Sequence, residues 1–211
     1  MTSHPESILQ GDPLSAAAEQ VHFVPKDFFQ RITPASLFPK DQPLEVDLGC
    51  GEGAFLTAMA ARHPERNFLG VERLVGRVRN VCRIAAHQRL TNVRVIRVEN
   101  SYLVEHLLPP GSVNTAWVLF PDPWPKRYHH RRRLVQEPFL RQVFQMLAPG
   151  GELCVKTDDQ PYFLWMENAF SQVPEFQRVE WLPDPNEAIT NFERRFLNQG
   201  LPIYRARLRK P

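Results

Sequence analysis

The chain has 211 residues, of which 43% are hydrophobic and 23% are charged, and its formal net charge is +3. This length and composition suit one α/β domain with a full hydrophobic core and short extensions. The apolar runs are far shorter than the roughly 20 residues that a membrane helix needs, so we expect no membrane partner. Residues 1–18 have no basic start and no continuous apolar block, so we expect no secretory signal.

The three cysteines, Cys50, Cys82 and Cys154, form no CxxC pair. Their spacing indicates neither a zinc site nor a disulfide framework, so we expect free thiols and no bound metal. Free thiols are typical of a reducing compartment, and we therefore expect the chain to be cytoplasmic.

The first 43 residues differ from the rest of the chain. Residues 1–20 are small and polar, without periodicity, and are expected to form a loose arm. Prolines at positions 25, 34, 39 and 43 keep any helix within residues 21–43 short. We therefore predict a partly flexible N-terminal arm over residues 1–43 and one domain over residues 44–211.

From residue 44 onward, short apolar segments alternate with segments of helical periodicity. Strands are predicted at residues 44–48, 67–71, 93–98, 113–120 and 152–156. Helices are predicted at residues 54–62, 73–90 and 134–147. An irregular segment is expected at residues 182–200, followed by a strand at residues 203–209. This alternation predicts an α/β fold with a mostly parallel sheet, helices on both faces, and ligands bound at the carboxyl ends of the strands.

Gly49, Gly51 and Gly53 directly follow the first predicted strand. Together with Ala54 they fit both a methyl-donor loop and the dinucleotide fingerprint G-x-G-x-x-A. Glu72, at the end of the next strand, could hold a ribose in either case. The loop alone therefore does not distinguish a methyl donor from a nicotinamide cofactor.

Acidic residues at the strand ends do distinguish the two cofactors. Asp47 precedes the loop and Glu52 lies within it, Glu99 and Asn100 follow the third strand, and Asp122 follows the fourth. A pyrophosphate would be repelled by carboxylates that converge on one crevice, whereas S-adenosylmethionine carries a sulfonium and an ammonium. S-adenosyl-L-methionine is therefore the expected cofactor.

The most specific motif is Phe120-Pro121-Asp122-Pro123-Trp124-Pro125-Lys126. Its prolines fix φ and remove donors, so the segment is predicted to be a stiff loop just beyond a strand. Such a loop would place Asp122, Phe120 and Trp124 beside the methyl donor, in the way that a flipped base is held between apolar faces. The alternative is a proline-rich connector whose Trp124 only fills the core.

A run without any acidic residue follows this motif. Charge runs are usually solvated surface, but this one adjoins the proposed active site, which favours contacts with RNA phosphates. Arginines of the predicted 73–90 helix could extend that surface or could only solvate the helix. The run consists, after Lys126 and Arg127, of Tyr128, His129, His130, Arg131, Arg132 and Arg133.

In this order, the motifs resemble the bacterial tRNA (guanine-N7)-methyltransferase family. The resemblance extends over most of residues 44–209 and implies a Rossmann-like, class I S-adenosylmethionine-dependent methyltransferase domain. It also implies methyl transfer to N7 of a guanine in the variable loop of tRNA. Further matching pieces are Leu69-Gly70-Val71-Glu72, Lys156-Thr157-Asp158, Thr190-Asn191-Phe192-Glu193 and Pro202-Ile203-Tyr204-Arg205-Ala206.

The resemblance also assigns site residues. Asp47 stands where the family usually has glutamate, and Glu99-Asn100-Ser101 stands where it usually has Asp-Ala, so the third-strand contact stays open between Glu99 and Asn100. The basic run Tyr128 to Arg133 would meet RNA. The implied substrate residues are Lys126, Asp158, Thr190, Asn191, Phe192 and Glu193. The implied cofactor residues are Asp47, Gly49, Gly51, Glu72, Glu99, Asn100 and Asp122.

Guanine N7 carries a lone pair and no proton, so its attack on the sulfonium methyl group needs no general base. We therefore expect Asp122 to be catalytic through orientation and charge stabilisation, while Asp122 or Asp158 accepts hydrogen bonds from the guanine edge. The alternatives are methylation of another RNA position, a catalytically idle RNA-binding protein with this fold, and a nicotinamide dehydrogenase. The sequence does not indicate the oligomeric state.

Overall fold

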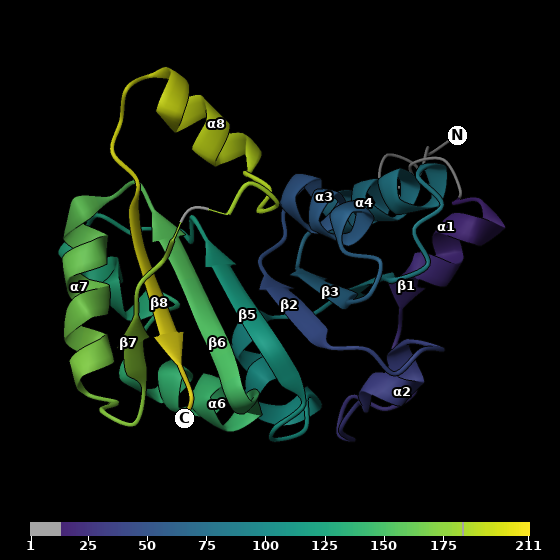
Figure 1. Cartoon of the computed structure of the whole chain (residues 1–211), viewed down its shortest axis with the longest axis horizontal. Helices are drawn as coiled ribbons and strands as arrows, with labels where there is room; N and C mark the ends of the chain where they lie inside the picture. The colour runs from purple at the N-terminus through teal and green to yellow at the C-terminus, as the bar shows by residue number, and fades with distance from the viewer. Residues whose placement is uncertain (1–13, 183) are drawn as a thin grey trace, which may run out of the picture.

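The computed structural model describes residues 14–182 and 184–211, in which one sheet has the strand order β1-β4-β3-β2-β5-β6-β8-β7 (Figure 1). Paired strands from β1 to β6 are parallel, whereas β8 runs antiparallel to both β6 and β7. The predicted mostly parallel sheet is therefore confirmed. The strands are β1 His22–Phe23, β2 Leu44–Leu48, β3 Asn67–Glu72, β4 Val93–Arg97, β5 Val113–Leu119, β6 Leu147–Thr157, β7 Gln177–Val179 and β8 Tyr204–Arg209.

Helices cover both faces of the sheet, as predicted (Figure 1). The helices α1, α3 and α4 pack against one face, and α6 and α7 pack against the other. No helix in the described part of the chain is long and apolar enough to cross a membrane. The helices are α1 Ala16–Val21, α2 Pro34–Leu37, α3 Ala54–Arg62, α4 Val75–His87, α5 Asn100–Tyr102, α6 Glu137–Met146, α7 Gln160–Ser171 and α8 Asn191–Asn198.

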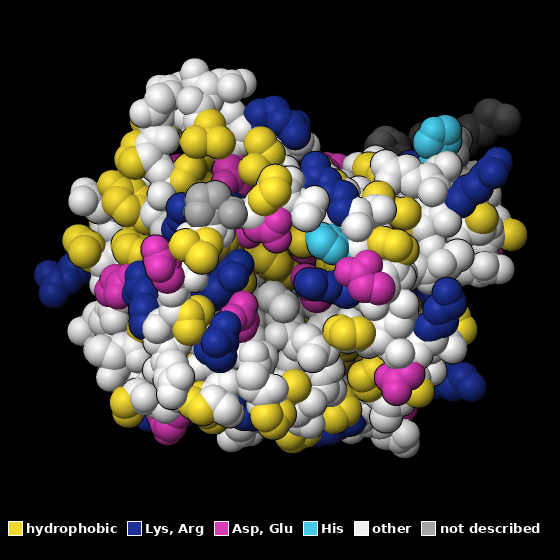
Figure 2. Space-filling model, viewed as in Figure 1, with side chains coloured by type: hydrophobic (Ala, Val, Ile, Leu, Met, Phe, Trp, Pro, Cys, Tyr) yellow, Lys and Arg dark blue, Asp and Glu magenta, His cyan; other side chains and the backbone are white. Residues whose placement is uncertain are grey.

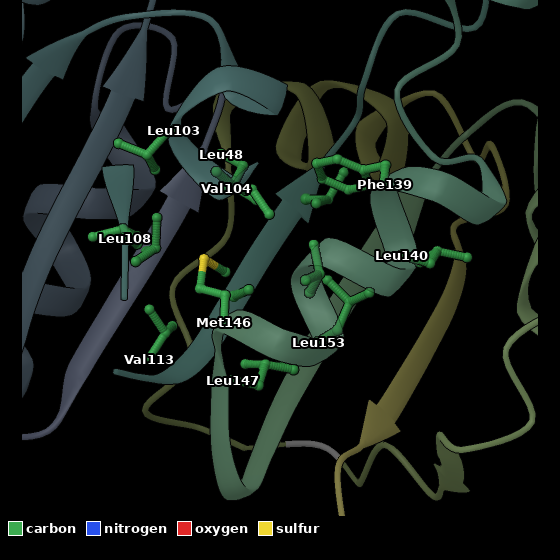
Figure 3. Close-up of a cluster of buried hydrophobic side chains, with 14 of the residues drawn as sticks. Leu48, Leu103, Val104, Leu108, Val113, Phe139, Leu140, Met146, Leu147 and Leu153 are labelled. Atoms are coloured by element: carbon green, nitrogen blue, oxygen red, sulfur yellow. The ribbon is translucent and has the colours of Figure 1, made fainter. Parts of the chain in front are cut away.

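Neighbouring residues of the central strands point into two separate cores. In β3, Phe68 belongs to the core under α3 and α4, whereas Leu69 and Val71 belong to the core under α6 and α7. Figure 3 shows the second core, in which Met146 of α6 and Leu153 of β6 are buried. A strand that is covered on both faces must be apolar on both, which explains the short continuous apolar runs of the sequence.

Most predicted elements are present, and two of them, β2 and α3, have the predicted bounds. The helix predicted from residue 73 begins at Val75, because the Glu72 carboxylate accepts the N–H groups of Arg73 at 2.7 Å and Leu74 at 2.8 Å. The strand predicted to reach residue 120 ends one residue earlier, because Phe120 has a φ of 53°. The helix predicted from residue 134 begins at residue 137.

Two predictions of irregular structure are wrong. Helix α8 lies within the segment 182–200, and the side chain of Thr190 caps it by accepting the N–H of Glu193 at 2.9 Å. Helix α1 lies partly within the arm that was expected to be loose, and Ser15 caps it in the same way. The part of that arm up to residue 13 lies outside the described residues. Both caps are Ser/Thr side chains that a sequence can reveal.

Two glycines allow the packing of this fold to be tested with one type of substitution. A Cβ atom at Gly70, in β3, would lie 2.5 Å from Leu56 Cδ2 and 2.9 Å from Cys50 Sγ. We expect Gly70→Ala to lower the free energy of unfolding by about 1–3 kcal/mol, which is the usual cost of overpacking. A Cβ atom at Gly76, in the first turn of α4, would meet nothing within 4 Å.

Gly76→Ala should therefore be neutral or should stabilise the protein by up to about 1 kcal/mol. Urea unfolding followed by circular dichroism compares the two variants with the wild type. Equal losses of stability in both variants would contradict the packing described for Gly70.

Candidate active site

A cleft of about 1150 Å³ opens at the carboxyl ends of β2, β3, β4 and β5. Because β3 lies on one side of β2 and β5 on the other, the connections that leave these strands diverge and a crevice forms between them. The walls are formed by the starts of α3 and α4, the loop after β5 and the start of α8. In Figure 1, β2, β5 and β6 point toward this region, between α3 and α8.

The cleft brings together most of the residues that the sequence singles out. The expected site residues that do not line it are Lys126, Tyr128, His129, His130, Asp158 and Glu193. Those that do line it are Asp47, Gly49, Gly51, Glu72, Glu99, Asn100, Asp122, Arg131, Arg132, Arg133, Thr190, Asn191 and Phe192.

The loop after β2 turns sharply and lies close to two other elements. The N–H groups of Gly49 and Cys50 both donate to the carbonyl of Val71, each at 2.9 Å. Gly53, the N-cap of α3, has a φ of 80°, and a Cβ atom there would lie 2.7 Å from Val81 of α4. Glycine is therefore required for this turn, and the backbone of the loop stays open to a ligand in the cleft.

Two buried carboxylates, Asp47 and Glu72, form the floor of the cleft. Glu72 accepts the N–H groups of Arg73 and Leu74 through Oε1, while Arg77 Nη1 lies 3.6 Å from its Oε2. Burial, with a further contribution from the charge of Glu72, raises the pKa of Asp47 to about 7. The floor thus combines two carboxyl groups with the Arg77 guanidinium beside Glu72, and a cationic ligand would suit the Asp47 carboxyl.

This pKa predicts how the stability of the ligand-free protein changes with pH. The Asp47 carboxyl stays protonated in the folded protein up to about pH 7, whereas in the unfolded chain it ionises at about pH 4. Between these values the folded state binds more protons, so this group lowers the free energy of unfolding as the pH rises. Asp47→Asn stays neutral throughout. Over the same pH range, the free energy of unfolding should therefore fall by up to about 4 kcal/mol less in this variant than in the wild type.

Urea titrations of the wild type and Asp47→Asn between pH 4 and 8 measure this difference. Parallel pH profiles for the two proteins would show that Asp47 does not titrate as described. The two profiles should become parallel only well above the folded pKa of about 7, where the wild-type carboxylate is ionised in both states.

Glu99 and Asn100 follow β4 and both line the cleft. The Glu99 carboxylate caps α5, accepting the N–H of Ser101 at 3.4 Å. The amide nitrogen of Asn100 would lie 3.5 Å from a Cβ atom on Gly49, so this side chain approaches the glycine loop. The structure therefore leaves the choice between these two residues open.

The proline-rich loop after β5 is held in a strained conformation. Phe120 and Trp124 have φ values of 53° and 44°, in a region that non-glycine residues rarely adopt. The N–H of Phe120 donates to the carbonyl of Lys156 in β6 at 2.8 Å, and Asp122 lines the cleft between the two strained residues. Backbone strain persists only where surrounding contacts enforce it, and it concentrates at functional sites.

The basic run forms the 3₁₀ helix Arg127–Arg132 next to this loop. Arg131 and Arg132 are exposed and line the cleft, and the guanidinium of Arg132 lies 5.0 Å from the centre of the Trp124 ring. Arg133, in contrast, is only 4% exposed, so its side chain does not fit the phosphate contact that its place in the run suggests.

Lys156, at the end of β6, anchors the segment that leads into α8. It is 2% exposed, and its Nζ lies 2.7 Å from Glu187 Oε1 and 2.8 Å from Glu193 Oε1. Glu193 thus pairs with a buried lysine and does not face the cleft, whereas Thr190 and Phe192 beside it do. No sequence signal pairs Lys156 with Glu187, because the two residues are distant in the chain and the pairing arises only on folding.

Comparison with known proteins identifies relatives of this chain. Residues 41–206 match a family model described as "Putative methyltransferase". A tRNA (guanine-N(7)-)-methyltransferase of Halorhodospira halophila is 39% identical over 80% of this chain and 75% of that protein. One of Syntrophotalea carbinolica is 36% identical over 81% of this chain and 75% of that protein. The solved structure of the 16S rRNA methyltransferase KamB has a TM-score of 0.62 at 18% identity, over 86% of this chain and 96% of that one, which shows a shared fold.

Proposed function

This chain belongs to the tRNA (guanine-N7)-methyltransferase family, and we propose that it methylates N7 of a guanine in the variable loop of tRNA with the residues of the cleft described above. One observation carries the proposal. The same cavity contains an acidic floor beside a glycine loop, a rigid loop with Asp122 between aromatic residues, and Arg131 and Arg132. A cationic methyl donor, a purine base and a polyanion therefore each find a matching surface there.

S-adenosyl-L-methionine, the methyl donor, fits the charges of the floor. We assign Glu72 to the ribose hydroxyls, and Asp47 with the backbone of the glycine loop to the rest of the cofactor. Glu99 or Asn100 would meet the adenosine. When bound, the cofactor would supply an electrophilic methyl group that guanine N7 can attack with its lone pair, while the electron pair of the breaking C–S bond stays on sulfur and S-adenosylhomocysteine leaves. The Asp47 carboxyl supports this assignment, because a neighbouring positive charge would offset the burial and the Glu72 charge that together raise its pKa to about 7.

The guanine is assigned to the part of the cleft between the proline-rich loop and α8. Trp124 and the half-exposed Phe192 offer apolar faces, and Asp122 offers a carboxylate to the base edge. A base extruded from its RNA is held by this combination of stacking and edge recognition. Thr190 and Asn191 add polar groups on the α8 side. Asp158, directly after β6, stays a second candidate for the guanine edge, although it does not line the cleft.

No proton has to leave N7, so Asp122 need not act as a base. It would accept hydrogen bonds from N1–H and N2–H of the guanine, and these bonds strengthen as the ring becomes cationic. The strained loop supports this role because it fixes the carboxylate before the substrate arrives.

Arg131 and Arg132 are assigned to tRNA phosphates, with Tyr128 and His129 on the same 3₁₀ helix extending the contact. On the face shown in Figure 2, basic side chains are scattered among acidic and hydrophobic ones and form no continuous field. Phosphate binding therefore depends on the local basic run and not on that whole face. With tRNA as its substrate, we place the reaction in the cytoplasm.

The methylated product distinguishes the proposed function from its alternatives. An unmodified tRNA transcript is incubated with the protein and S-adenosylmethionine carrying an isotopically labelled methyl group, then digested and mapped by mass spectrometry. We expect labelled 7-methylguanosine within the variable loop. Label on another nucleoside would assign the enzyme to a different RNA position. Binding of tRNA and cofactor without any transfer would make the chain an idle RNA-binding protein.

The role of Asp122 predicts a graded response to substitution. Asp122→Ala removes both the acceptor and the charge and should lower the single-turnover rate about 10²–10⁴-fold. Asp122→Asn keeps an acceptor of similar shape and should retain more activity than the alanine variant. Both variants should fold, because prolines and the hydrogen bond from Phe120 to Lys156 fix the loop.

Single-turnover methylation with saturating cofactor and tRNA gives the three rates. Equal and complete loss of activity in both variants, with cofactor and tRNA still bound, would show instead that the reaction requires an ionised carboxylate at this position.

A further inference from the structure

Arg133 differs from the two arginines that precede it. Arg131 and Arg132 line the cleft with exposed side chains, whereas Arg133 is only 4% exposed although the three residues are consecutive. The 3₁₀ helix ends at Arg132, and Arg133, whose backbone is extended, also borders the cleft but with a buried side chain. A residue so buried needs partners within the protein, because burying an unpaired charge is costly.

The partners of Arg133 come from the proline-rich loop and from α7. Its Nε donates to the carbonyl of Pro123 at 2.9 Å. Its guanidinium lies 4.9 Å from the centre of the Tyr162 ring and 5.1 Å from that of the Trp165 ring. Both rings are fixed by Val135, whose N–H donates to the Tyr162 hydroxyl and whose carbonyl accepts the Trp165 indole N–H, each at 3.1 Å.

The carbonyl of Pro123 lies between Asp122 and the strained Trp124. This carbonyl belongs to the peptide between Pro123 and Trp124, so the hydrogen bond from Arg133 fixes that peptide plane, which begins one residue after Asp122. The bond comes from a guanidinium that is stacked on rings of α7, a helix packed in the core. Arg133 thus connects the rigid interior to the one segment of the loop that carries a carboxylate.

We propose that Arg133 is a positioning residue for Asp122, which holds the strained loop in the conformation needed for methyl transfer and does not contact RNA phosphates. The inference rests on the proposed function of the cleft, and it divides the basic run into two parts. Arg131 and Arg132 bind RNA, while Arg133 shapes the loop. A lysine can replace Arg133 only in part, because a planar guanidinium is needed both to stack on the rings and to direct Nε–H at the carbonyl.

Two measurements separate positioning from phosphate binding. The first is the dissociation constant of tRNA without cofactor at several salt concentrations, and the second is the single-turnover methylation rate at saturating tRNA. Arg133→Ala and Arg133→Lys should both keep the wild-type salt dependence but methylate about 10–100-fold more slowly, with the lysine variant the less impaired. Arg131→Ala combined with Arg132→Ala should weaken tRNA binding and reduce the logarithmic salt slope by about two.

A control variant separates a lost position from lost stability. Phe144 packs against Phe176, 5.0 Å between ring centres, and does not line the cleft. Phe144→Leu should therefore lower the urea midpoint without changing the methylation rate of the folded protein. If Arg133→Ala fails to fold, two other variants test the proposal: Arg133→Lys, and Trp165→Leu, which removes one ring of the stack. We expect both to methylate more slowly than the wild type and to keep its salt slope.

A salt slope reduced by about one in Arg133→Ala and restored in Arg133→Lys would overturn the proposal, since a phosphate contact requires only the charge. A wild-type rate in Arg133→Ala would overturn it as well. If the wild-type protein itself does not methylate tRNA, the proposed function of the cleft fails, and this result is separate from any property of Arg133.

Discussion

Lys156, at the end of β6, holds both the proline-rich loop and the segment that contains α8. Its carbonyl accepts the N–H of Phe120 and so fixes the start of the loop, while its ammonium pairs with Glu187 and with Glu193 of α8. Separating these buried charges would leave at least one of them uncompensated, which is strongly unfavourable. Both the proline-rich loop and the segment that contains α8 are therefore attached to β6, an interior strand of the sheet.

Charge is distributed unevenly along the cleft. The carboxylates of Asp47 and Glu72 lie at the floor, whereas the guanidinium groups of Arg131 and Arg132 lie beside the proline-rich loop. The floor repels phosphates and attracts a cation, and the basic residues do the opposite. Under the proposed function, this separation of charge would direct a positively charged donor and a polyanionic substrate to different parts of one cavity.

Features set by local sequence could be predicted, whereas features set by tertiary contacts could not. The glycine loop, the carboxylates at the strand ends and the rigid proline-rich loop follow from element alternation and from the fixed φ of proline. The start of α8 is also visible in the sequence, because Thr190 and Glu193 form a capping pattern. No local pattern separates Arg132 from Arg133, however, since their different burial depends on rings of α7. The pairing of Lys156 depends in the same way on a segment far along the chain.

The position of β8 between β6 and β7 has a consequence for the order in which the cleft is completed. Among the described residues, β7 pairs with β8 and with no other strand, although β7 precedes both α8 and β8 in the chain. While the chain is being translated, β7 has no place in the sheet, and the segment with α8 is tethered at one end only, until β8 has emerged and paired with β6. Under the proposed function, a nascent chain would therefore complete the glycine loop and the acidic floor of the cleft before α8 takes its place near the proline-rich loop.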